Sequence, residues 1–104
     1  LLEDMLTEQG YQTFLASDGK VGVDLYKTNH GRIDAVILDM NMQEMHGKET
    51  YDKLSEINPD VKVLIATGDP ESSDVLALSK NKHVRVISKP YSMNELYQAL
   101  QLLA

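Results

Sequence analysis

The sequence contains no cysteine, has no excess of basic residues and has no long apolar run. The lack of cysteine excludes disulfide bonds, cysteine-based zinc sites and thiol catalysis, and it fits a reducing compartment. With 10 basic residues against 16 acidic ones and a net charge of −6, the chain lacks the clustered positive charge that nucleic-acid binding requires. No stretch approaches the roughly 18 apolar residues that span a bilayer. These absences predict a cytoplasmic protein that binds neither nucleic acid nor membranes directly.

The composition is that of an ordinary globular domain. Hydrophobic residues make up 42% and charged residues 25% of the 104 residues, which argues against disorder. The length suits one domain, and no repeat, low-complexity stretch or linker divides the chain. We therefore expect residues 1–104 to form a single domain.

Helical and strand-like patterns alternate along the chain. Helices are expected at 1–9, from caps at Ser17 and Asp18 to about residue 30, and at 47–57, 72–80 and 92–103. The last of these begins with a capping box, formed by Ser92 and Glu95. Short strands are expected at 11–16, 33–38, 61–66 and 84–88, and the apolar runs at 33–38 and 61–66 suit strands buried on both faces. Such alternation predicts an α/β fold, a doubly wound parallel sheet with helices on both faces.

Three strand ends carry side chains that can act on a phosphoryl group. Asp39, Thr67 and Lys89 each follow a predicted strand, and ligands of such sheets bind at the carboxyl ends of the strands. An Asp can attack phosphorus, while a hydroxyl and an ammonium group can hold the phosphoryl oxygens. Singly, each residue also fits a turn, a helix cap or the surface. Their occurrence at successive strand ends favours a shared site.

The chain resembles the receiver domain of two-component response regulators over its whole length. The segment 38–47, with a strand-end Asp, three Met and a closing Gly, is similar to the phosphoacceptor segment of that family. The segment 88–91, Ser-Lys-Pro-Tyr, is similar to its Lys-Pro-aromatic motif, and the spacings between Asp39, Thr67 and Lys89 also fit. The resemblance implies a flavodoxin-like receiver fold.

The resemblance also implies a function in phosphorelay signal transduction. Asp39 would accept a phosphoryl group from a histidine kinase, Thr67 would bind a phosphoryl oxygen, and Lys89 would pair with the phosphoryl group or the free carboxylate. Asp39 and the main-chain carbonyl of Asn41 would be metal ligands for Mg²⁺, and the Lys89–Pro90 peptide would be cis. The implied partner is a histidine kinase or a phosphotransfer protein. A kinase or output domain linked covalently to the receiver domain is a further implied partner. The resemblance leaves homodimer formation open.

The chain departs from the family pattern at its front. The family begins with a strand that ends in an acidic, Mg²⁺-binding pair, whereas this sequence begins within the first helix. Glu3 and Asp4 lie too close to Asp39 to be that pair and are interpreted as solvent-facing. We therefore expect the N-terminal strand and the remaining acidic ligands to be missing, and Mg²⁺ binding by this chain alone to be weak.

Further departures concern the residues that would transmit the phosphorylation signal to the rest of the domain. Val86 stands where the family has a switch aromatic, and Gln43 stands where it has a proline. A buried Val has few rotamers, so the signal should pass through residues 67–71 and the start of the next helix. Tyr91 is the nearest aromatic that could share in it. The output face would comprise residues 72–80, 84–88 and 92–103. His30, His46 and His83 are isolated, without metal-ligand spacing, and are interpreted as surface residues rather than metal ligands.

Two other readings compete with a phosphoaccepting switch. An interaction module of the same fold that is never phosphorylated would suit the missing acidic pair, but not the presence of Asp39, Thr67 and Lys89. A haloacid-dehalogenase-like phosphatase would need a second carboxylate two residues after its nucleophile, and Asn41 cannot transfer protons. We therefore expect a regulatory domain rather than an enzyme, with only self-catalysed phosphotransfer and dephosphorylation.

Overall fold

The computed structural model describes residues 19–39 and 47–103. The expected helix at 1–9 and strand at 11–16 lie outside these residues, as do Asn41, Gln43 and His46. No helix in the described ranges is long and apolar enough to cross a membrane.

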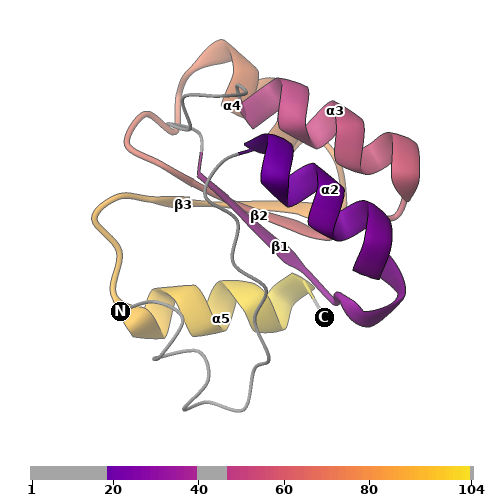
Figure 1. The fold of residues 1–104 in the computed structure, drawn as a ribbon. Coiled ribbons are helices and arrows are strands. Elements are labelled where there is room, and N and C mark those ends of the chain that lie inside the picture. Colours follow the sequence, from indigo (N-terminus) through magenta and orange to yellow (C-terminus); the bar gives the residue numbers. More distant parts are fainter. Residues whose placement is uncertain (1–18, 40–46, 104) are drawn as a thin grey trace.

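Helices and strands alternate along the described chain, as the sequence predicts (Figure 1). The helix at 47–57 and the strand at 84–88 have the predicted bounds. The other elements differ from their predicted bounds by one to three residues at their ends or by a short helical extension. In chain order they are α2 (Gly19–Asn29), the 3₁₀ helix η1 (His30–Arg32), β1 (Val36–Asp39), α3 (Gly47–Ile57), β2 (Val63–Thr67), α4 (Ser73–Ser79), β3 (Val84–Ser88) and α5 (Met93–Leu103).

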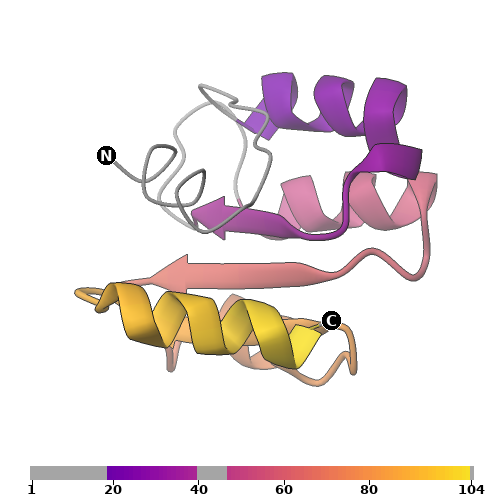
Figure 2. The same cartoon turned by 90° about the horizontal axis from the view of Figure 1, so that it is seen from below.

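The three described strands form a parallel sheet in the order β1-β2-β3. Asp39 lies opposite Ala66 of β2, and Thr67 lies opposite Ser88 of β3. Figure 2 shows the arrowheads of β1 and β2 at the same edge of the sheet. The carboxyl ends of all three strands therefore meet along one edge.

Helices cover both faces of this sheet, so the doubly wound prediction is confirmed (Figure 2). One apolar cluster joins alternate strand residues, including Leu38, Val63 and Ile65, to α2, α3 and α4. The other cluster joins Leu64 and its neighbours to α5. Because β2 contributes to both clusters, every residue of this strand is buried, as its unbroken apolar run predicts.

Several predicted bounds need correction, and local hydrogen bonds explain why. β1 begins at Val36 rather than at residue 33, because Ile33 caps η1 and donates its N–H to the His30 carbonyl. β2 begins at Val63 rather than at residue 61, because Val61 donates to Asn58 within a turn. The helix expected at 72–80 is shorter: residue 72 is its N-cap and residue 80 its C-cap.

Candidate site at the carboxyl edge of the sheet

Asp39 and Thr67 end β1 and β2, and Lys89 directly follows β3, so all three lie at the carboxyl edge of the sheet. Asp39 ends β1 and lies in register with Ala66, the residue before Thr67. Thr67 ends β2, and its carbonyl accepts a 2.8 Å hydrogen bond from the N–H of Lys89. Parallel strands lie about 4.8 Å apart, so the main chains of Asp39 and Lys89 each neighbour the end of β2, one on either side. This arrangement agrees with the expectation from the sequence that they share an edge.

Thr67 is held by its own loop. The residue is 3% exposed, and its Oγ1 accepts a 3.0 Å hydrogen bond from the N–H of Asp69. A hydroxyl that accepts this bond retains its own hydrogen for donation. Thr67 therefore presents a donor at the sheet edge, and the Asp69 N–H, a group that the sequence does not reveal, positions it.

The segment after β3 has the conformation expected of it. The Lys89–Pro90 peptide bond is cis, as the resemblance implies. Lys89 is half-buried and Pro90 is exposed. The main chain of Lys89 thus stays bonded to the end of β2 while the chain turns away toward α5.

Val86 and Tyr91 pack against different faces of the sheet. Val86 joins the cluster beneath α2, α3 and α4, whereas Tyr91 joins the cluster beneath α5. The sheet therefore lies between the two side chains, and they do not share a packing environment. Of the two, Val86 lies on the same side as α4.

No group of three or more His, Asp or Glu side chains within residues 19–39 and 47–103 could hold a metal ion. Asn41 falls outside these ranges, and Asp39 is described by its main chain. The predicted metal ligands therefore remain predictions.

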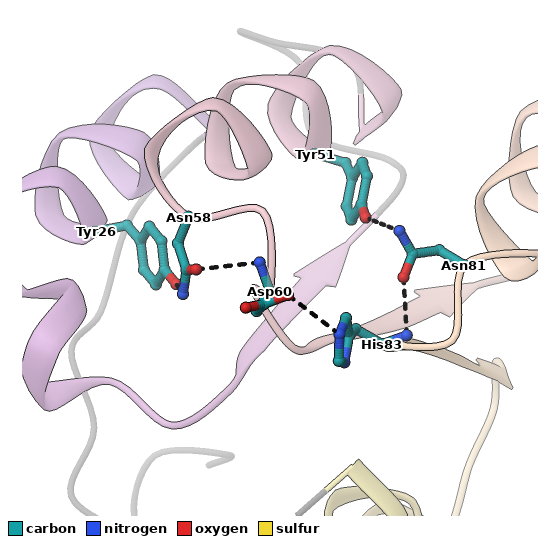
Figure 3. Close-up of polar contacts among 6 residues, drawn as sticks. All are labelled: Tyr26, Tyr51, Asn58, Asp60, Asn81 and His83. Atoms are coloured by element: carbon teal, nitrogen blue, oxygen red, sulfur yellow. Dashed lines mark hydrogen bonds and ion pairs between the residues drawn. The ribbon is translucent and has the colours of Figure 1, made fainter.

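The opposite, amino edge of the sheet carries a polar network that the sequence does not predict (Figure 3). Asn58 and Asn81 each bond to a tyrosine hydroxyl on another helix. His83 is half-buried, and its Nε2 lies 3.6 Å from Oδ1 of Asp60, a contact that the sequence does not indicate. The sequence signal for Asn58 was its position before Pro59, which predicts only the end of a helix.

The fold and the row of strand ends together define an open flavodoxin-like domain with its candidate site at the carboxyl edge. A sequence model of the response regulator receiver domain matches residues 1–101. The chain belongs to this family, whose members are phosphoacceptor domains of two-component signalling.

Relatives of known sequence and structure agree with this assignment. The chain is 30% identical to the transcriptional regulatory protein GlrR of Escherichia coli over 96% of its own length and 22% of that protein. It is 28% identical to sporulation initiation phosphotransferase F of Bacillus subtilis, covering 97% of this chain and 80% of that protein. The crystal structure of the receiver domain of sensor histidine kinase PA1611 from Pseudomonas aeruginosa, with magnesium in its active site cleft, superposes with a TM-score of 0.81. It is 24% identical, and the match covers 96% of this chain and 82% of that one.

These relatives differ greatly in length. The chain spans about a fifth of GlrR but four fifths of the sporulation phosphotransferase. A receiver domain of this kind therefore occurs both alone and within a longer protein.

Proposed function

We propose that Asp39 is the phosphoacceptor of this receiver domain. What supports the proposal is the parallel register, in which Asp39 ends β1, Thr67 ends β2 and the N–H of Lys89 bonds to Thr67. An oxygen of the Asp39 carboxylate attacks the phosphorus of a phosphohistidine, and the phosphorus–nitrogen bond breaks. The histidine leaves with the electron pair of that bond, and an acyl phosphate forms on Asp39.

Thr67 and Lys89 stabilise the transferred group in this proposal. The Thr67 hydroxyl donates to one phosphoryl oxygen, and the ammonium group of Lys89 compensates the charge on another. Asp39 and the Asn41 carbonyl are two oxygen ligands of the kind that Mg²⁺ prefers, and they would form part of its ligand set. Mg²⁺ supplies the remaining positive charge that the phosphoryl oxygens require.

The partner in this reaction is a histidine kinase or a phosphotransfer protein. Support comes from the relatives, one of which is a phosphotransferase and another of which is the receiver of a sensor histidine kinase. We propose that residues 1–104 are a single receiver domain and that its chemistry is confined to accepting and losing the phosphoryl group. A kinase or output domain would supply the rest of the pathway.

The response would pass through the loop at 67–71 into the start of α4. Ser72 caps α4 and is bonded to Asp69, so this loop connects Thr67 directly to the helix. Val86 lies on the α4 side without an aromatic ring to rotate, and Tyr91 packs on the α5 side. Residues 73–79, 84–88 and 93–103 would form the face that a partner reads.

The test is phosphorylation by a small-molecule phosphodonor in excess Mg²⁺, followed by intact mass spectrometry. The wild-type protein should gain the mass of one phosphoryl group, and chelation of Mg²⁺ should prevent this gain. Asp39→Asn should show no gain, because an amide cannot form the acyl phosphate. Asp69→Asn is the matched control, since it removes a nearby carboxylate and should leave phosphorylation intact. An undiminished mass gain in Asp39→Asn would refute the proposal.

A further inference from the structure

Two turns at the amino edge of the sheet are built from the same parts. Asn58 follows α3 and Asn81 follows α4, and each donates its N–H to a carbonyl in the last turn of its helix. Each Asn carbonyl then accepts from the residue three positions later, at 3.0 Å for Asn58 and 3.1 Å for Asn81. Each Oδ1 accepts from the residue two positions later, which is Asp60 in one turn and His83 in the other. The two helix-to-strand connections therefore share one geometry.

Each turn is also tied to a helix that precedes it in the chain (Figure 3). Nδ2 of Asn58 donates to the hydroxyl of Tyr26 on α2 at 3.1 Å, and Nδ2 of Asn81 donates to that of Tyr51 on α3 at 2.7 Å. Tyr26 is 3% and Tyr51 7% exposed. Buried tyrosine hydroxyls require such partners, so both contacts are parts of the packed structure.

The second contact bears on α4, because the two ends of this helix are held differently. At its front, the Ser72 cap and the Asp69 carbonyl belong to the loop that begins at Thr67. At its rear, Asn81 is bonded to Leu78 of α4 and to Tyr51 of α3. The turn at the rear also reaches the sheet, since the His83 carbonyl accepts from the N–H of Val63. The front end thus depends on the candidate site and the rear end on the rigid core.

We propose that the Tyr51–Asn81 hydrogen bond is a tether that fixes the rear of α4, so that this helix moves at its Ser72 end when Asp39 is phosphorylated. The inference rests on the proposed phosphoacceptor function for the movement, but the tether itself is a property of the resting protein. A helix fixed at one end transmits a displacement of its loop as a tilt. Tyr51 is then a positioning residue for the output face that acts through Asn81.

The resting protein tests the tether without any phosphoryl chemistry. In Tyr51→Phe, the amides of His83 and Val84 should exchange with deuterium about five- to tenfold faster, as loss of one hydrogen bond predicts. The amides of Asp60 and Val61 should change less. Tyr26→Phe is the matched control, because it removes the same hydroxyl from the other turn and should give the opposite pattern. Equal acceleration of both turns in both variants would mean global destabilisation and would refute the tether.

The second measurement is a beryllofluoride titration of the protein with Mg²⁺, followed through amide chemical shifts. In the wild type, the shift changes should be large at 67–76 and fade toward 79–84. In Tyr51→Phe they should extend through 79–84, whereas in Tyr26→Phe they should not. Identical profiles in all three proteins would refute the fixed rear end. If deuterium exchange shows the expected pattern in both variants but beryllofluoride causes no shift changes, the tether is supported and the phosphoacceptor proposal is refuted.

Discussion

The side chain of Tyr51 contributes both to the apolar core and to the turn that follows α4. Its ring belongs to the cluster beneath α3, and its hydroxyl accepts from Asn81. Burial raises the pKa of the phenol, and the neighbouring carboxylate of Asp52 raises it further. The residue therefore holds its proton more firmly in the folded protein than in the unfolded chain.

This pKa shift predicts a pH dependence of stability. As the pH rises above the usual tyrosine value of about 10, the unfolded chain releases the Tyr51 proton while the folded protein retains it. The free energy of unfolding should then fall until the pH exceeds the folded-state pKa. Urea unfolding at pH 8 and pH 11 should show a larger loss for the wild type than for Tyr51→Phe. Every residue except Tyr51 is the same in the two proteins, so an equal loss would contradict this prediction.

Pairs such as Tyr51 and Asn81 mark the limit of prediction at the residue scale. The residues lie 30 positions apart, and nothing in a local pattern connects an Asn after one helix to a Tyr on another. The row of Asp39, Thr67 and Lys89 was predictable, because each residue follows an apolar strand and the parallel fold aligns strand ends. The Asp69 N–H that positions Thr67 was not predictable, since every residue except proline carries such a group.

At the scale of elements, α5 has both the cap and the apolar face that the sequence pattern predicts. The expected capping box is confirmed: the N–H of Glu95 donates to Ser92 Oγ at 3.1 Å, and the N–H of Ser92 donates to Glu95 Oε1 at 3.3 Å. The residues at helical spacing, Leu96, Leu100 and Leu103, are buried against the sheet. In contrast, β1 and β2 begin later than predicted, because apolar residues before them are used in η1 and in a turn.

Removal of the Ser92 hydroxyl should weaken α5. Ser92→Ala leaves one N–H in the first turn without its cap and should lower the free energy of unfolding by about 1 kcal/mol. Glu95→Gln is the matched control, because its side-chain oxygen can still accept from Ser92 and the loss should be smaller. Urea denaturation followed by circular dichroism measures both. If Ser92→Ala unfolds at the wild-type midpoint, the capping box does not stabilise the helix.

At the scale of the whole molecule, the alternation of elements was sufficient to predict a parallel sheet with two covered faces. It did not predict which helix covers which face. Because crossovers are right-handed, the face that a helix covers follows from the order of the strands in the sheet. The alternation of helices and strands along the chain does not determine that order. The structure assigns α2, α3 and α4 to one face and, within residues 19–39 and 47–103, α5 alone to the other.

The repeated turn geometry at the amino edge implies that the two connections are interchangeable. Pro59 and Asp60 occupy the places in one turn that Lys82 and His83 occupy in the other. Because Asp60 and His83 lie opposite each other, exchange of both pairs would still place an acid facing a histidine, with their positions reversed. The exchanged protein should therefore keep its free energy of unfolding to within about 1 kcal/mol, the scale of an exposed ion pair. Urea denaturation measures this, and a loss several times larger would mean that each turn is specific to its own surroundings.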